Sequence, residues 1–177
     1  MAEDPYRMLD GPGTSPSLVI GVGNASRRDD GVGLAVARRL RTRSARPARI
    51  VEFEGEGTGL LDLWEDERFV VVVDAVRSGA APGTVHRIDT SGSFVFPSKP
   101  TSSTHGLSVG EAVHLGRSLG RLPGRLVVYG VEGSEFTPGD ELSPPVARAV
   151  DRVVESILAE RASAPVAGRT APELPHA

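Results

Sequence analysis

The chain has 177 residues, which suffices for one domain with a substantial core and is too short for a second full domain. Hydrophobic residues make up 39% and charged residues 24% of the chain, as is typical of a folded globular protein. The net charge of −3 and the aromatic content of 5% argue against nucleic acid as a partner. The absence of cysteine excludes disulfides, thiolate metal ligands and cysteine nucleophiles, so any metal must bind His, Asp or Glu.

Both ends of the chain differ in composition from its middle. Residues 1–17 and 161–177 contain several prolines and no apolar periodicity, which predicts flexible tails around an α/β domain of residues 18–160. The N-terminal segment is acidic and lacks the apolar stretch of a signal peptide. The longest hydrophobic run, Phe69 to Val73, is too short to cross a bilayer. We therefore expect a cytoplasmic protein without a membrane insertion.

The first half of the domain alternates strands and helices. Leu18 to Gly21 is a short apolar run that predicts a strand, and Gly31 to Arg43 has apolar residues spaced four apart, as on one face of a helix. A second strand is expected over Ala48 to Phe53 and a short helix over Thr58 to Glu67. Phe69 to Val73 is continuous and β-branched, which is typical of a strand covered on both faces.

The second half continues the alternation after an irregular stretch. Thr84 to Asp89 carries polar residues at alternate positions and predicts an edge strand. Thr90 to Thr104 has no periodicity, and a loop of this length in a small domain is usually functional or disordered. The remaining elements are a helix over Gly106 to Leu119, a buried strand over Arg125 to Val131 and an amphipathic helix over Ser143 to Glu160. In that last helix Ser143 is the expected N-cap, with Pro144 at the first helical position.

This order predicts a three-layer α/β domain with a mostly parallel sheet, whose ligands bind outside the carboxyl ends of the strands. Three residues whose side chains can bind a metal ion or exchange a proton fall on that side. Asp74 follows a run of valines, Asp30 lies near the start of the helix after the first strand, and His105 ends the irregular loop. Two carboxylates and one imidazole form a donor set suited to Zn²⁺ or Ni²⁺.

Each of these residues also has an ordinary structural explanation. Asp30 can be a plain helix N-terminal residue, which the helix dipole favours. Asp74 can cap a loop by accepting backbone N–H groups, and His105 can be a surface residue. The functional hypothesis rests on the expected convergence of all three at one edge of the sheet.

The glycine-rich segment after the first strand invites a second hypothesis, a nucleotide-binding loop. Gly21-Val22-Gly23 matches the start of a dinucleotide fingerprint, but Ser26 stands at its third glycine position. A tight turn that needs a flexible backbone explains these glycines better. A serine-hydrolase hypothesis lacks the G-x-S-x-G motif altogether.

Five separated blocks between residues 18 and 160 resemble the hydrogenase maturation protease family, nickel-dependent endopeptidases that trim the C-terminal extension of the [NiFe] hydrogenase large subunit. The blocks are Val19 to Asn24 with Asp29 to Gly33, then Gly57-Thr58, then Val72 to Val76, then Ser103 to Ser108, and finally Gly130 to Glu132 ahead of Glu141 to Ser143. The chain has Asp30 where the family often has Glu, and Glu56-Gly57-Thr58 where Gly-Gly-Thr is usual.

The resemblance implies a phosphorylase/hydrolase-like α/β/α sandwich whose five-stranded sheet is mostly parallel, with one antiparallel strand. It implies that Asp30, Asp74 and His105 contact nickel and carry the catalysis. It also makes five loop residues candidates for substrate contact: Gly23, Asn24, Gly57, Thr58 and Thr104.

The same resemblance implies that nickel arrives in the large-subunit precursor and is not held permanently by the protease. The metal would polarise the scissile carbonyl or lower the pKa of a bound water, or one aspartate would act as general base. A relative that inspects the nickel centre without cutting, as a checkpoint or chaperone, is the alternative within the family. The nucleotide-binding module remains a third hypothesis.

Overall fold

The computed structural model describes residues 16–43, 48–55, 57–90 and 108–160. Ten elements follow one another along the chain: β1 (Leu18–Val22), η1 (Arg28–Gly31), α1 (Val32–Arg43), β2 (Arg49–Phe53), α2 (Thr58–Trp64), β3 (Phe69–Val76), β4 (Val85–Asp89), α3 (Val109–Leu119), β5 (Arg125–Glu132) and α4 (Pro144–Ala159). The two expected tails and most of the irregular loop lie outside the described residues. Ser17, which the sequence analysis placed in the N-terminal tail, donates its backbone N–H and its hydroxyl to Phe69 O.

The five strands form a single sheet in the order β2-β1-β3-β5-β4. All neighbouring pairs are parallel except β4 with β5, where Val85 pairs with Val131 and Asp89 with Val127. The predicted five-stranded, mostly parallel sheet with one antiparallel edge strand is therefore confirmed. No helix in the described ranges is long and apolar enough to cross a membrane.

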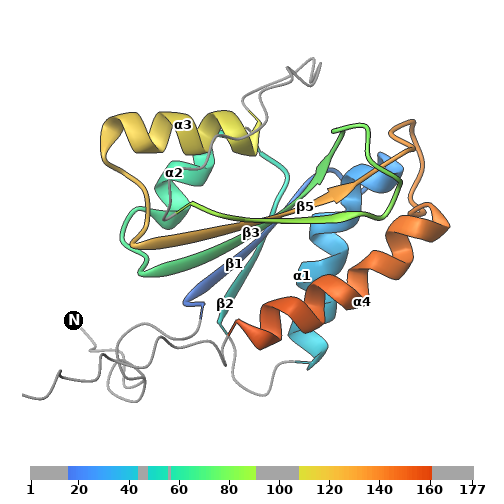
Figure 1. Ribbon diagram of the computed structural model, residues 1–177, viewed down its shortest axis with the longest axis horizontal. Coiled ribbons are helices and arrows are strands. Elements are labelled where there is room, and N and C mark those ends of the chain that lie inside the picture. The colour runs from blue at the N-terminus through green and yellow to red at the C-terminus, as the bar shows by residue number, and fades with distance from the viewer. Residues whose placement is uncertain (1–15, 44–47, 56, 91–107, 161–177) are drawn as a thin grey trace, which may run out of the picture.

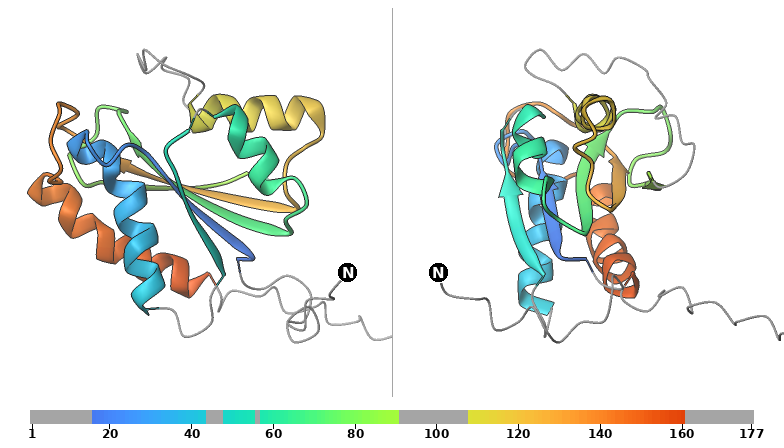
Figure 2. Two further views of the ribbon diagram at one scale, coloured as in Figure 1. Left: turned by 180° about the vertical axis from the view of Figure 1, so that it is seen from behind. Right: turned by 90° about the vertical axis from the view of Figure 1, so that its left-hand side faces the viewer.

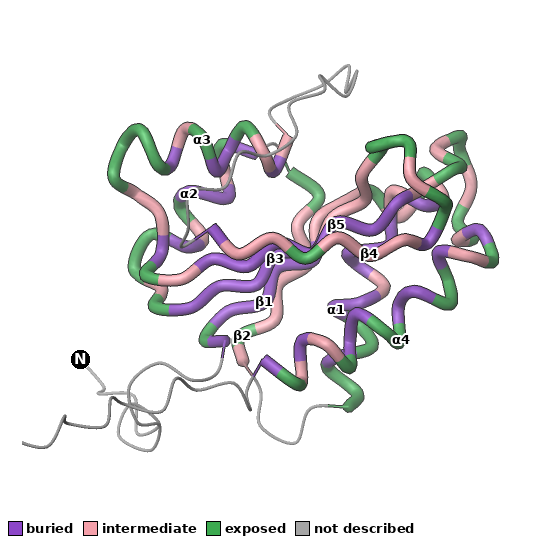
Figure 3. The backbone as a smooth tube through the Cα atoms, in the orientation of Figure 1, coloured by how far each residue is buried: buried purple, intermediate pink, exposed green. Residues whose placement is uncertain are grey.

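Helices cover both faces of the sheet, as Figures 1 and 2 show. Helices α1 and α4 pack on one face and α2 and α3 on the other. Successive side chains of a strand point to opposite faces, so in β3 Val71 and Val73 join the α1/α4 core while Val70 and Val72 join the α2/α3 core. The central strands β1, β3 and β5 and the inner sides of the helices are mostly buried, whereas the edge strands β2 and β4 are mostly half-buried (Figure 3).

Strands β1 and β3 lie at the point where the chain changes direction across the sheet. From β1 the chain passes through α1 on one face to the edge strand β2, and then returns through α2 on the other face to β3. Strand β3 in turn leads to β4 at the opposite edge, so the chain leaves β1 and β3 toward opposite sides of the sheet. In open α/β sheets, ligands bind at the carboxyl ends of such a strand pair. The fold therefore places its natural ligand site where β1 and β3 end.

The N-terminus of α1 packs directly on the backbone of this crevice. An ideal Cβ on Gly33 would lie 2.2 Å from Val22 O and 2.4 Å from Val73 O, so only glycine fits. Gly21 in β1 is equally close to the helix, since its Cβ would lie 2.1 Å from Gly33 O. The two glycines let α1 approach closely enough to hold the preceding turn, η1, at the strand ends.

Two predicted details differ from the structure. Strand β3 does not end at Val73 but continues to Val76, so Asp74 lies within the strand, where its register partner is Gly130. Ser143 does occupy the N-cap position of α4, but its hydroxyl makes no capping hydrogen bond and donates to Asp29 instead.

Candidate active site

The site begins with two carboxylates at the carboxyl ends of β1 and β3. Asp74 lies in β3 at a position that shares its face with Val72 and therefore points to the α2/α3 side. Asp30 lies in η1, the short turn between the β1 loop and α1. Their charges interact, because the Asp30 carboxylate raises the pKa of Asp74. Asp30 and Asp74 therefore lie close enough to influence each other's ionisation, and their joint role as a site stays a prediction.

Of the two carboxyl groups, that of Asp74 has the more strongly raised pKa. Burial and the charge of Asp30 raise its pKa to about 7, against the opposing effect of a 2.8 Å hydrogen bond from the Ala75 N–H. Burial also raises the pKa of Asp30, while Arg27, the Asn24 N–H and Arg77 act to lower it. Near neutral pH the pair therefore readily takes up a proton or a cation, which is the property required of a general base or of a cation ligand.

His105 and Thr104, the other residues expected near this pair, lie outside the described residues. Ser108 is the first residue described after them, and it caps α3 in a reciprocal arrangement with Glu111. No cluster of three potential metal ligands occurs in the described ranges. The metal site predicted from Asp30, Asp74 and His105, and the placement of His105 itself, stay predictions.

The β1 loop is built around Asp30. Gly23 has a φ of +143°, and a Cβ there would lie 1.8 Å from Asp30 O, so the glycine is needed for a close backbone contact. The Asn24 N–H donates to the Asp30 carboxylate, while the Asn24 side chain accepts the Ser26 N–H at 2.9 Å. These contacts favour the tight turn over the nucleotide-binding loop as the reason for the glycines.

The β2–α2 loop supplies the remaining substrate-loop candidates. Gly57 is buried and begins α2, where its carbonyl accepts the Leu60 N–H. Thr58 is the first residue of α2 and is exposed. Both follow β2, which pairs with β1 in parallel, so this loop leaves the same edge of the sheet as the β1 loop.

The turn that carries Asp30 is held in place by Asp29, whose role the sequence analysis missed. Asp29 is fully buried and accepts the N–H groups of Ser134, Glu135 and Ser143 at 2.7–2.9 Å. Its carboxylate also accepts the Ser143 hydroxyl at 2.9 Å. Burial alone would raise the pKa of Asp29, but these donors together lower it. Adjacent aspartates in the sequence thus have opposite roles, one structural and one facing the crevice.

Backbone contacts strengthen the same junction. The Arg28 N–H donates to Gly139 O at 2.8 Å, and the Asp29 N–H donates to Glu135 O at 2.9 Å. Arg28 has a φ of 50°, a left-handed conformation that is unfavourable for a residue with a side chain. Such strain persists where the surroundings fix the backbone, and here the 134–143 loop does so. Asp30 is therefore presented from a rigid turn.

Glu132 organises the chain beyond β3 in a similar way, and the sequence analysis missed this role too. Its buried carboxylate accepts the N–H groups of Ser78 and Gly79 and the Ser78 hydroxyl at 2.7–3.1 Å. Although burial acts to raise the pKa of Glu132, these hydrogen bonds and nearby His86 lower it. Glu132 thus fixes the loop that follows β3, the strand that contains Asp74.

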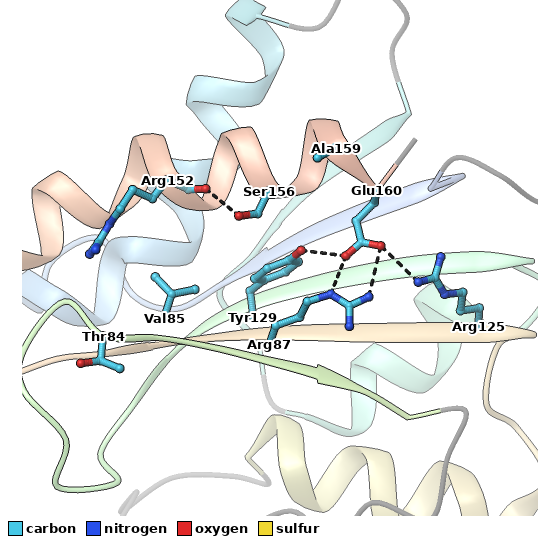
Figure 4. Close-up of a pocket in the computed structure, with 9 residues that line it drawn as sticks. All are labelled: Thr84, Val85, Arg87, Arg125, Tyr129, Arg152, Ser156, Ala159 and Glu160. Atoms are coloured by element: carbon cyan, nitrogen blue, oxygen red, sulfur yellow. Dashed lines mark hydrogen bonds and ion pairs between the residues drawn. The ribbon is translucent and has the colours of Figure 1, made fainter. Parts of the chain in front are cut away.

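A groove of about 740 Å³ lies elsewhere, between β4 and α4 (Figure 4). Its polar side chains are paired with one another. Glu160 accepts Tyr129 Oη at 2.8 Å and Arg87 Nε at 2.7 Å, and Arg125 Nη2 lies 3.1 Å from the same carboxylate. Because these groups satisfy each other, the network ties the end of α4 to the sheet and does not compete with the Asp30–Asp74 pair as a catalytic centre.

We expect Asp29→Asn to destabilise the fold by about 2–4 kcal/mol, because the amide would turn a donor toward backbone donors and leave them unpaired. Asp30→Asn should cost less than about 1 kcal/mol, since burial already disfavours the charged form of Asp30. Urea unfolding of both variants at pH 7 measures the difference. Equal stability losses would contradict the division of roles between the two aspartates.

Known proteins share this five-stranded α/β architecture. The structure of the hydrogenase maturating endopeptidase HybD from Escherichia coli superposes with a TM-score of 0.66 and 26% identity over 80% of this chain and 89% of that one. A hydrogenase maturation protease from Thermococcus kodakarensis, at 24% identity and a TM-score of 0.60 over 82% and 92% of the two chains, shows the same fold.

Sequence comparison agrees. The hydrogenase 2 maturation protease of E. coli is 29% identical over 147 residues, which cover 80% of this chain and 88% of that protein. The hydrogenase expression/formation protein HupD of Rhodobacter capsulatus is 27% identical over 81% of this chain and 70% of its own length. The family profile described as hydrogenase maturation protease matches residues 34–160. The chain belongs to the hydrogenase maturation protease family, and it is a peptidase.

Proposed function

We propose that this chain removes the C-terminal extension of a [NiFe] hydrogenase large-subunit precursor after nickel insertion, and that Asp30, Asp74 and His105 recognise the inserted nickel. The observation that carries the proposal is the Asp30–Asp74 pair at the switch point of a maturation-protease fold. Gly23, Asn24, Gly57 and Thr58 surround the same edge and would contact the polypeptide, together with Thr104. The cytoplasmic location expected from the sequence is part of this proposal.

The chemistry of the pair fits a cation that belongs to the substrate. Two carboxylates that repel each other gain from a shared divalent ion, which removes the repulsion that raises the pKa of Asp74. With the His105 imidazole they form an O,O,N donor set suited to an ion of borderline hardness. Nickel in the precursor would supply polarisation of the scissile carbonyl or of a water molecule.

The residues of this chain supply the remaining parts of the reaction. As the alternative to binding nickel, Asp74, whose pKa is raised to about 7 when no cation is bound, would accept a proton from an attacking water and later return it to the leaving amine. Asp30 keeps its place because Asn24 and the Asp29 junction fix η1. Both aspartates are half-buried, which weakens the solvation of their charged forms.

The protein purified without its substrate is expected to carry little stoichiometric metal. Three ligands without a thiolate leave an ion largely coordinated by water unless the precursor adds donors. Elemental analysis by mass spectrometry after gentle purification measures the content. One tightly held zinc per chain would contradict the proposal and indicate a metallohydrolase with its own ion.

Purified precursor provides the test of the function itself. Nickel-loaded and nickel-free precursor are each incubated with the protein, and the intact mass of the large subunit is followed over time. The proposal expects a single loss of mass, equal to one C-terminal peptide, only in the nickel-loaded sample. Tight binding of the loaded precursor without any loss of mass would overturn proteolysis and support the checkpoint role.

A further inference from the structure

Arg77 places a cation near the carboxylate pair, where its charge lowers the pKa of Asp30. It lies three residues after Asp74, just beyond the end of β3, and its side chain is exposed. Its Cζ lies 3.9 Å from the centroid of the Phe136 ring. In the described ranges its guanidinium makes no hydrogen bond or ion pair. A guanidinium stacked on a ring keeps its in-plane N–H donors available for another group.

The ring beneath Arg77 is itself fixed. A Cβ on Gly133 would lie 2.5 Å from the Phe136 ring and 3.1 Å from Asp29 Cβ, so the ring packs closely against the junction that holds η1. The Gly133 N–H donates to Val76 O at 3.0 Å, which anchors this junction to the end of β3. Arg77 therefore stacks on a ring that is itself fixed, because the ring packs against Gly133 and Gly133 is hydrogen-bonded to the end of β3.

A second arginine contacts Phe136 from the other side of the site. Arg27 Nη2 donates to Phe136 O at 3.2 Å, and the Asp30 N–H donates to Arg27 O at 3.2 Å. Phe136 thus gathers one arginine from the β1 loop through its carbonyl and another from the end of β3 through its ring. Each arginine is three residues from one of the paired aspartates.

We propose that Arg27 and Arg77, assembled on Phe136, bind a carboxylate of the polypeptide that is cut and so determine which substrates dock. We call these three residues the arginine clamp; its assignment rests on the proposed function. Two carboxylates at the centre of a site repel acidic substrates, and two adjacent guanidiniums offset that repulsion while offering a planar fork to a carboxylate. The bound group is either an acidic side chain near the scissile bond or the terminal carboxylate of the extension.

The first experiment compares Arg77→Gln with Arg68→Gln as a matched control. Arg68 is an exposed arginine just before β3, at the opposite end of this strand from Arg77. Arg77→Gln should raise KM for nickel-loaded precursor about five- to tenfold, with kcat at the variant's own pH optimum within about twofold. Its pH profile should shift slightly upward, because Arg77 lowers the pKa of Asp30. The difference in KM should shrink at high salt, because screening weakens an exposed charge pair. Arg68→Gln should match the unmodified protein.

A second variant tests the role of the Phe136 ring separately from the charge of Arg77. Phe136→Leu leaves both arginines in place but removes the ring on which Arg77 stacks, and it should raise KM in the same direction. Arg77→Lys, which keeps the charge and loses the planar fork, should fall between Arg77→Gln and the unmodified protein. An unchanged KM in Arg77→Gln overturns the clamp. So does a loss of rate that is fully explained by a shift of the pH profile.

The source of the carboxylate is identified with Arg77→Glu. Each acidic residue of the precursor's extension is replaced by Lys in turn, and separately one extra residue is appended to its C-terminus. Rescue of Arg77→Glu by one Lys substitution identifies a side chain. A KM that rises with the appended residue for the unmodified protein, but not for Arg77→Gln, identifies the terminal carboxylate.

Affinity for the precursor, measured in parallel by biolayer interferometry, separates this inference from the proposed function. Binding that depends on Arg77 without any cleavage supports the clamp and contradicts proteolysis. Cleavage with an affinity and KM that do not depend on Arg77 contradicts the clamp and leaves proteolysis supported. If the precursor neither binds nor is cut, both are overturned.

Discussion

Replacing Asp74 with Asn is expected to abolish processing of the precursor and, at pH 8, to stabilise the folded chain. The carboxylate is the group that accepts a proton or contacts the substrate's nickel, and an amide does neither. The amide oxygen can still accept the Ala75 N–H, which now bonds to Asp74 Oδ1, so the local backbone should be retained. Loss of activity together with a gain in stability is typical of a functional residue held in an unfavourable environment.

The sign of the stability effect follows from the raised pKa. Folded Asp74 has a pKa of about 7, and an unfolded aspartate has its ordinary value of 3.8, so the folded state binds more protons between these values. The contribution of Asp74 to stability is therefore fully present below its unfolded pKa of 3.8 and is lost as the pH rises through its folded pKa of about 7. Asn does not titrate, so Asp74→Asn should unfold like the unmodified protein near pH 4 and be about 1–3 kcal/mol more stable at pH 8.

Urea unfolding at pH 4 and pH 8, beside the intact-mass assay of processing, measures both effects. Asp66→Asn is a suitable control, because Asp66 is an exposed aspartate that follows α2 and precedes the amino end of β3, whereas Asp74 lies toward its carboxyl end. The control should process the precursor normally and show no gain in stability at pH 8. A processing-competent Asp74→Asn, or one that is less stable than the unmodified protein at pH 8, would contradict the assigned role.

Gly33→Ala is the second variant with a large expected effect, in this case on the fold. The added methyl would meet the carbonyl oxygens of Val22 and Val73, which are backbone atoms of β1 and β3 and cannot rotate away. Helix α1 would have to move off the sheet, at a cost of more than about 3 kcal/mol. Thermal unfolding should show a fall of about 10 °C or more, or the variant should fail to accumulate.

Gly31→Ala is the matched control, two residues earlier in the same turn. Its Cβ would lie 3.4 Å from the nearest atom, Ala25 Cα, which is ordinary contact. A change of less than about 1 kcal/mol is expected there. If both variants are equally stable, the close approach of α1 to the strands does not carry the energetic weight that we assign to it.

Much of the fold was predictable because it depends on local pattern. The run of valines in β3 could only be a strand covered on both faces, and the apolar stripe of α4 required a helix against the sheet. The polar alternation of 84–89 correctly indicated an edge strand, and the resemblance supplied its antiparallel direction. Strand ends were less predictable, since β3 continues through Asp74 by pairing with β5, a contact between distant segments.

The site was predictable only where chain position fixes chemistry. Asp30 and Asp74 follow from the rule that ligands bind at the carboxyl ends of parallel strands. Asp29 was missed because its five hydrogen-bond donors come from Ser134, Glu135 and Ser143, more than a hundred residues away in the chain. Its one visible signal is that Asp29-Asp30-Gly31 offers two carboxylates, of which only one can face the crevice.

The central claim is that Asp30 and Asp74 are required for removal of the C-terminal extension from the large subunit. Intact-mass spectrometry of the large subunit made in cells tests this claim most directly. The large subunit is co-expressed in nickel-containing medium with its other maturation factors and with the unmodified protein, with a variant carrying both Asp30→Asn and Asp74→Asn, or with neither. Intact-mass spectrometry should find the shortened large subunit only with the unmodified protein, and the full-length precursor in the other two samples. Equal shortening with the double variant would contradict the account.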